Sequence, residues 1–401
     1  MKKFSYEARD KATGKIEKAE IQAETEMAAG RLLLERGLVP IKDLKEAGQG
    51  STLERLTTRI TSKDKIVFTR QFATLIGAGL PLAQALRTVA EQTENKKMRS
   101  VVEEITARVE GGSSLSDSFS KHPEVFDKVY LALIAAGELS GTLDESLRRI
   151  ALQQEKDAAM MSKIRGALTY PLIVLVVIGL VMGFLMFTVV PQVEQLYKDM
   201  KKELPFLTQV MVGTANFLMS FWWLILIIII GLGVLFANWL KTDMGIRFSA
   251  KFKLNVPIFN PLFRKLYMAR FCRTGQLLLS TGISMVDMLG ITSDAVNNVV
   301  IKERIDDASK KVAGGKNLSD ALKDKDYILP LVPQMISIGE KSGKIDEMMG
   351  KTAQVYEDEL DEQIKAISTM IEPILMVVMA VMAGGMIGAI LFPIYSLVQG
   401  I

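Results

Sequence analysis

Three long stretches without a charged residue most constrain what this chain can fold into. They run from Pro171 to Val193, from Leu204 to Leu240, and from Pro373 to Ile401. Each exceeds the ~20 apolar residues that a helix needs to cross ~30 Å of hydrocarbon. The sequence therefore predicts three transmembrane helices, with boundaries at residues 171–192, 214–240 and 372–395.

Basic residues beside these stretches indicate how the spans are oriented. They precede the first and third spans and follow the second, at Lys156, Lys163, Arg165, Lys241, Arg247, Lys251, Lys253, Lys351 and Lys365. Positively charged flanks favour the cytoplasmic side. The N-terminus lacks the apolar core and the cleavage site of a secretory signal. We expect a multi-pass protein with a cytoplasmic N-terminus and an external C-terminus.

The chain also contains an internal repeat. At an offset of 203, Phe68-Thr69-Arg70 matches Phe271-Cys272-Arg273, and Leu115-Ser116-Asp117 matches Leu318-Ser319-Asp320. At an offset of 202, Gly137-Glu138-Leu139-Ser140-Gly141 matches Gly339-Glu340-Lys341-Ser342-Gly343, and Pro171 matches Pro373. Matches in one order indicate a duplicated unit: a helical domain followed by one span. The second span has no counterpart in the repeat. Because it adds one more membrane crossing between the two copies, both helical domains would lie on the same side of the membrane.

This pattern predicts an all-α membrane protein with two repeated cytoplasmic six-helix bundles, three transmembrane helices and a small N-terminal αβ module. In the module we expect strands at 4–9, 16–22 and 38–44 and a helix at 25–36. The predicted divisions are 1–45 for the module, 46–64 for a linker, 65–170 for the first bundle, 193–213 for an external loop, 241–371 for the second bundle, and 396–401 for an external tail.

Few residues are suited to catalysis or to metal binding. His122 is the single histidine and Cys272 the single cysteine, so neither a His-based triad nor a multi-cysteine zinc site can be assembled. Residues 339–345 resemble a phosphate-binding loop, but the glycine spacing is one residue short and no Ser or Thr follows Lys344. Acidic residues are interleaved with the basic ones, which argues against nucleic-acid binding. We expect no enzyme, cofactor or metal.

Two features leave alternatives open. The paired Gly-Glu-x-Ser-Gly segments predict turns between helices. Glu138 and Glu340 either belong to this turn chemistry alone or bind a partner's basic residue or a divalent cation. Glu372, before Pro373, is either solvated at the membrane interface or paired with a cation inside a bundle of subunits. Small residues at 383–385 and 388–389 favour close approach of another helix.

The segment Lys163-Ile164-Arg165-Gly166-Ala167-Leu168-Thr169-Tyr170-Pro171, followed by Val190-Pro191, resembles the signature of the type II secretion F and type IV pilus platform family. The duplicated unit, the paired turns, the Glu372-Pro373 pair and the three spans are also similar to that family. The resemblance covers nearly the whole chain. The candidate interaction residues that it implies are Arg70, Gly137, Glu138, Ser140, Gly141, Lys163, Tyr170, Pro171, Arg273, Gly339, Glu340, Ser342, Gly343, Glu372 and Pro373.

The resemblance implies a non-catalytic platform in the bacterial inner membrane. It implies partners of four kinds: a cytoplasmic hexameric assembly or retraction ATPase, pilins or pseudopilins, other inner-membrane assembly subunits, and a second copy of the chain as a homodimer. The expected function is coupling of the ATPase to extraction and polymerisation of pilins. Two alternatives remain, namely a platform of a type II secretion system and, more remotely, a small oligomeric transporter.

Overall fold

The computed structural model describes residues 2–10, 16–23, 32, 38–40, 45–46, 59–199, 206–257, 260–323 and 325–398. The chain divides into two compact units. One comprises Met1–Phe68 with Leu86–Ala107, and the other comprises Thr69–Ala85 with Arg108–Ile401.

The N-terminal segment contains an antiparallel sheet. Strand β1 (Lys2–Asp10) pairs with β2 (Ile16–Ala23), with Lys2 opposite Ala23 and Arg9 opposite Ile16. Strands β3 (Leu38–Pro40) and β4 (Lys45–Glu46) also pair with β1. The first two predicted strands are confirmed, and the third is confirmed over 38–40. The predicted helix at 25–36, except residue 32, and residues 41–44 lie outside the described residues. The predicted linker overlaps β4 at Glu46 and the next helix at 62–64, and its residues 47–58 are also not described.

Six helices follow in the first copy of the repeat. They are α3 (Ser62–Gly77), α4 (Leu82–Gln92), α5 (Lys96–Glu110), α6 (Leu115–Ser120), α7 (Lys128–Ser140) and α8 (Leu143–Asp199). The second copy has the same order in α11 (Asn260–Ser280), α12 (Met285–Ala295), α13 (Val299–Ala313), α14 (Leu318–Leu322), α15 (Leu331–Ser342) and α16 (Ile345–Val398). The predicted repeat of six helices is therefore present.

The helix ends confirm the repeat at the level of the backbone. Glycines with positive φ occur at Gly79, Gly112 and Gly141 in the first copy and at Gly282, Gly315 and Gly343 in the second. These positions are related by the same offsets that align the two halves of the sequence. The two copies therefore end corresponding helices in the same left-handed conformation, which glycine adopts without a steric penalty.

In the second copy, α11 and α16 form the centre of the core. Phe271 and Cys272 of α11 and Met349 and Leu360 of α16 are buried almost completely. The thiol of Cys272 has no exposed surface, as expected for a residue that acts as a small hydrophobe, and burial raises its pKa above the ordinary range. Helix α15 also packs against α16, and its apolar residues Val332 and Ile336 are buried.

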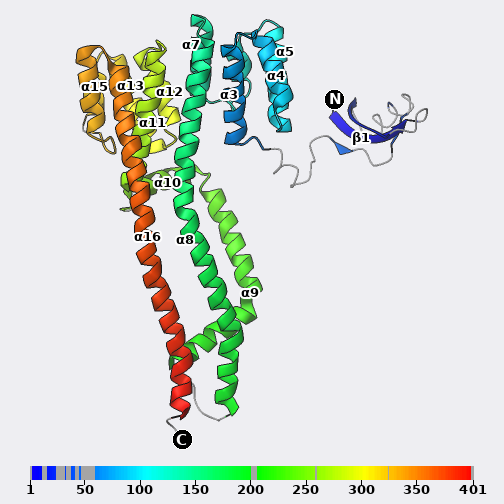
Figure 1. Cartoon of the computed structure of the whole chain (residues 1–401), viewed down its shortest axis with the longest axis vertical. Coiled ribbons are helices and arrows are strands. Elements are labelled where there is room, and N and C mark those ends of the chain that lie inside the picture. Colours follow the sequence, from blue (N-terminus) through cyan, green and yellow to red (C-terminus); the bar gives the residue numbers. More distant parts are fainter. Residues whose placement is uncertain are drawn as a thin grey trace. The chain divides into compact units, whose positions relative to one another are not determined.

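Among the described residues, three helices contain a stretch long and apolar enough to cross a membrane: α8, the part of α16 from Ile345 to Gly385, and the part of α9 (Phe206–Trp239) from Ser220 to Trp239. Figure 1 shows α8 and α16 extending in the same direction and α9 returning in the opposite one. Helix α9 is interrupted at Phe221, where φ is −118° and ψ is 16°. Before this break, Val212 and Ala215 pack against Val190 of α8.

Candidate functional site

The two Gly-Glu-x-Ser-Gly segments form helix ends of the same geometry. Helix α7 ends at Ser140, and Gly141 caps it with φ of 75°; α15 ends at Ser342, and Gly343 caps it with φ of 70°. The hydroxyl of Ser140 donates to the carbonyl of Ala136 at 2.7 Å, and that of Ser342 donates to the corresponding carbonyl of Ile338 at 2.9 Å. The predicted turns are confirmed in both copies.

The first glycine of each segment permits close packing onto the next helix. A Cβ atom at Gly137 would lie 2.5 Å from Oγ of Ser146, and one at Gly339 would lie 2.7 Å from Cα of Ile345. Real Cβ atoms do not approach other atoms so closely. Each first glycine therefore brings its helix against the start of α8 or α16, the long helices that lead into the membrane.

The glutamate of each segment binds the start of a short helix. Glu138 accepts hydrogen bonds from the backbone N–H groups of Leu115 and Ser116, at 2.7 and 3.1 Å. Glu340 accepts from the backbone N–H of Leu318 at 2.6 Å and from the hydroxyl of Ser319. A carboxylate at a helix N-terminus satisfies free amide donors and interacts favourably with the helix dipole. Each glutamate thus connects two helices of its own copy. The turn motifs at residues 137–141 and 339–343 did not predict this role.

These contacts bear on the open question about the glutamates. Both carboxylates already accept hydrogen bonds from their own chain. Among the described residues, no group of three or more His, Cys, Asp or Glu side chains is arranged to hold a metal ion. The geometry therefore gives Glu138 and Glu340 an internal structural role, and binding of a partner's basic residue or a divalent cation stays a prediction.

Arg70 and Arg273 pair with glutamates at corresponding positions of the two copies. Arg70 lies 3.1 Å from Glu155 in a pair whose arginine side chain is 72% exposed. Arg273 binds both carboxylate oxygens of Glu357, at 2.8 and 2.7 Å, and its side chain is only 13% exposed. Glu155 and Glu357 are separated by the 202-residue offset of the repeat, so extending the self-comparison would have shown that they occupy corresponding positions but not that they pair with the arginines.

Ion pairs also connect α8 with α16, which belong to different copies. Lys163 donates to Asp361 at 2.6 Å, and Lys156 lies 3.9 Å from Glu357, the partner of Arg273. We call these four side chains with Arg273 the junction. Lys163 was predicted as a site residue from the resemblance, but its partner was not. No local spacing in the sequence relates Lys163 to a residue 198 positions away.

The remaining predicted residues lie where the long helices enter their uncharged stretches. Tyr170 is 60% exposed, and Glu372 and Pro373 are also exposed. Helices α8 and α16 continue through Pro171 and Pro373. A Cβ atom at Gly384, Gly385 or Gly388 would meet open space, so the small-residue face of α16 is not covered by the described part of this chain. The structure does not bring these residues together with the junction.

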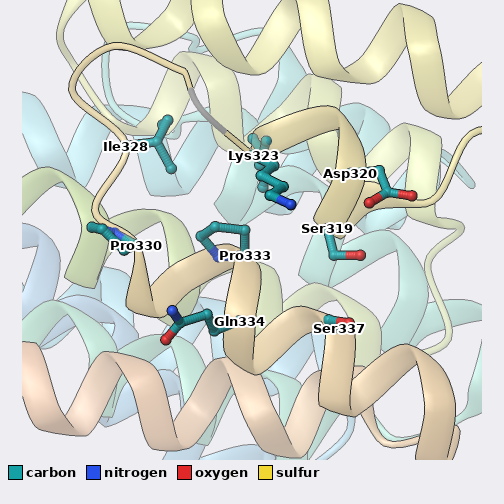
Figure 2. A pocket seen from close by; sticks show the side chains of 9 residues that line it. Ser319, Asp320, Lys323, Ile328, Pro330, Pro333, Gln334 and Ser337 are labelled. Atoms are coloured by element: carbon teal, nitrogen blue, oxygen red, sulfur yellow. The ribbon is translucent and has the colours of Figure 1, made fainter.

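The two copies differ in the space between their short helix and the helix that follows. In the first copy, Phe119, Phe126 and Tyr130 pack with ring centroids 4.4–5.3 Å apart. Leu322, Ile328 and Val332 stand at the corresponding positions of the second copy. A pocket of about 450 Å³ lies there, between Ser319 of α14, the loop carrying Ile328 and Pro330, and Gln334 of α15 (Figure 2).

A further contact links the two copies away from the junction. Nζ of Lys128 at the start of α7 donates to Asp294 of α12 at 2.6 Å, and Lys302 binds the same carboxylate. These two hydrogen bonds hold the pKa of the Asp294 carboxyl below its ordinary value.

Comparison with known proteins agrees with the duplicated architecture. Residues 68–191 and 271–393 each match the model of type II secretion system (T2SS) protein F, and residues 1–43 match its N-terminal domain. The two matched segments coincide with the two copies seen in the structure. Each matched segment includes Arg70 or Arg273, one Gly-Glu-x-Ser-Gly turn and most of the long helix that follows it.

Relatives cover the chain from end to end. A type IV pilus assembly protein PilC of Thermus thermophilus is 36% identical over 400 residues, which is 98% of this chain and 98% of that protein. The PilC protein of Myxococcus xanthus is 36% identical over 99% of this chain and 95% of its own length. A type II secretion system protein F of Pseudomonas aeruginosa is 32% identical over 100% of this chain and 99% of its own length. The chain is therefore a multi-pass membrane protein that belongs to the type II secretion system protein F family.

Proposed function

We propose that this protein is the inner-membrane platform of a type IV pilus assembly machine. The observation that carries the proposal is the difference between the relatives: the PilC proteins are 36% identical and the secretion protein is 32% identical, each over 98–100% of this chain. In this role the protein is not an enzyme. It couples a cytoplasmic hexameric ATPase to extraction of pilins from the bilayer and to their polymerisation.

The long helices supply a physical route for this coupling. Helix α8 has 57 residues and α16 has 54, so each extends roughly 80 Å at 1.5 Å per residue. In each copy one continuous helix belongs both to the helical domain and to the membrane span. A movement imposed on the domain is therefore transmitted to the span without an intervening loop. The junction pairs keep α8 and α16 in a fixed register, so the two spans move together.

The proposed topology has a cytoplasmic N-terminus and an external C-terminus. Support comes from the basic flanks of the spans and from the opposite directions of α9 and the other two long helices. Both helical domains then face the ATPase, and the apolar spans face pilin helices and other inner-membrane assembly subunits. A homodimer would place the uncovered small residues of α16 near a second copy.

A platform of a type II secretion system is the nearest alternative, since it shares the fold and differs in its fibre. A small transporter is a remote alternative that would need an oligomer to form a polar path. The alternatives differ in their partners: pilins and a retraction ATPase for pili, pseudopilins and a secretin for secretion, and a solute flux for a transporter.

Cross-linking of the tagged full-length protein in native membranes, followed by affinity purification and mass spectrometry, tests the proposal. We expect a hexameric ATPase linked to lysines of the helical domains and pilins linked near the spans. Recovery of pseudopilins without pilins would indicate that the protein is the platform of a type II secretion system. Recovery of neither class, with other membrane complexes intact, would refute the platform role.

A charge swap tests the coupling itself. Lys163→Glu places two acidic groups together at the junction, and we expect fibre assembly to fall while the protein still binds the ATPase. The double variant Lys163→Glu with Asp361→Lys restores an opposite-charge pair and should restore assembly. Normal assembly in the single variant, or no rescue in the double one, would exclude this pair from the coupling.

A further inference from the structure

Helix α10 (Asp243–Asn255) has two faces of different character. Ala250 and Leu254 are buried on one face, and Gly245 is buried near the start of the helix, close to the backbone of Trp239 and Leu240. The helix packs against α11 and α13, and Asn298 donates a hydrogen bond to the carbonyl of Ala250 at 3.4 Å. This inner face fixes the orientation of α10 on the second copy.

The outer face carries large apolar side chains that remain more than half exposed. Met244 is 79% exposed, Phe248 is 54% exposed and Phe252 is 57% exposed. Residues four apart lie on the same side of a helix, so the three side chains form one stripe along α10. A contiguous apolar stripe on a protein surface marks an interaction with another apolar medium or partner.

The position of the stripe indicates that the apolar medium it contacts is the lipid bilayer. Helix α10 begins four residues after Trp239, the last residue of the second span, and lies across the long helices in Figure 1. The ring of Trp239 lies 5.9 Å from that of Phe236 within the span and 5.4 Å from that of Phe248. Phe252 stacks on Phe248 at 6.0 Å. One row of aromatic rings thus continues from the membrane helix onto α10, at the level where Trp and Phe meet lipid headgroups.

The charges beside the stripe favour an anionic surface. The segment from Lys241 to Asn255 has four basic residues and one acidic residue, Asp243. Arg247 is paired with Glu303 at 2.7 Å, and Lys253 lies over the ring of Phe263. Lys241 and Lys251 are exposed. Lysines that flank an apolar helix face are typical of helices that bind anionic lipid headgroups in the plane of the membrane.

We propose that α10 is an interfacial helix that lies in the headgroup layer of the membrane leaflet next to the helical domains. Met244, Phe248 and Phe252 enter the boundary of the acyl chains, and Lys241 and Lys251 bind the phosphates of anionic lipids. This inference rests on the second span being in the bilayer and extends beyond the proposed function, since it requires no pilus component. A buried face on α11 and α13 with a lipid-bound face opposite also makes α10 a support for the second copy on the membrane surface.

Fluorescent labelling of the full-length protein in lipid vesicles tests the proposal. An environment-sensitive probe is attached at Met244→Cys or Phe252→Cys, in separate variants. The native Cys272 is fully buried, so the labelled wild type provides the background. The matched control is Leu139→Cys on α7, an apolar side chain that is 90% exposed. It lies before the start of α8, about 40 Å of helix from Pro171.

In vesicles of phosphatidylcholine with phosphatidylglycerol, we expect the α10 probes to emit at shorter wavelength than the Leu139 probe. They should be quenched several-fold less by aqueous iodide and more by nitroxide-labelled lipid. Iodide quenching of the α10 probes equal to that of the Leu139 probe would overturn the proposal. Protection found in native membranes but not in vesicles would also overturn it, because it would show that a protein partner and not lipid covers the stripe. Lys251→Glu should reduce the protection from iodide in anionic vesicles but not in vesicles of phosphatidylcholine alone. If the wild type and Lys251→Glu are protected equally in both kinds of vesicle, the role of anionic lipid is overturned.

Discussion

Arg70 and Arg273 occupy corresponding positions of the two copies but differ in exposure, and this difference allows a quantitative test of the junction. Arg273 is 13% exposed and binds both oxygens of Glu357, which is 17% exposed. Removing one member of such a buried pair costs about 3–5 kcal/mol, because the other charge remains buried without its partner. Lys156 remains 3.9 Å from Glu357, so we expect Arg273→Ala to cost about 3 kcal/mol, at the lower end of the range.

Hydrogen exchange of the full-length protein in detergent micelles measures this cost locally. A loss of about 3 kcal/mol in the free energy of opening accelerates exchange of the α11 amides roughly 150-fold. The counterpart Arg70 is 72% exposed and makes one contact with Glu155 at 3.1 Å. An exposed pair is worth about 0.2–1 kcal/mol, so Arg70→Ala should accelerate exchange in α3 by less than about fivefold.

A double variant separates the lost pairing from the unpaired charge. Arg273→Met with Glu357→Met removes both charges and keeps apolar volume, so it should restore much of the protection that Arg273→Ala removes. Equal acceleration by Arg70→Ala and Arg273→Ala would refute the argument from burial. A double variant less protected than the single one would show that the pair itself stabilises the contact between α11 and α16.

Three further predictions concern the paired turns and the second link between copies. Glu340→Gln removes the charge that binds the start of α14, and exchange of the α14 amides should rise about tenfold; unchanged exchange would argue against its capping role. Gly339→Ala should lower the melting temperature in detergent because its Cβ would lie 2.7 Å from Cα of Ile345, whereas Gly290→Ala, with open space around it, should stabilise α12 by about 0.5–1 kcal/mol. Equal shifts in the two variants would contradict the close approach. Asp294→Asn should destabilise the protein at neutral pH. The folded-state pKa of Asp294 lies below its ordinary value near 3.8, so the wild type should lose its stability advantage over Asp294→Asn as pH falls through that lowered pKa. Thermal unfolding of both proteins at several pH values measures the difference.

The repeated parts of the structure could be predicted from the sequence because each is encoded locally. Glycine at a helix end, an apolar helix face and an uncharged stretch each depend on neighbouring residues. Gly141 and Gly343 cap corresponding helices as their paired motifs predicted. The spans follow in the same way from runs of uncharged residues, whatever the rest of the chain does.

The contacts of the candidate site could not be predicted because they join residues that only the fold brings together. Lys163 meets Asp361 through the packing of α8 on α16, and Glu138 reaches back 23 residues to the start of α6. The two faces of α10 are a partial exception. Met244, Phe248 and Phe252 recur every four residues, so their spacing alone would have indicated an amphipathic helix.

The break in α9 sets a scale for the depth of the membrane. A break in a helix is tolerated better at the edge of the hydrocarbon than at its centre, so we infer that Phe221 lies near one surface of the apolar layer and Trp239 near the other. Eighteen helical steps separate them, a thickness of about 27 Å. The packed cluster of Val190, Val212 and Ala215 lies on the far side of the break from Trp239. This small protein core therefore holds α8 and α9 together at the end of the spans opposite the helical domains.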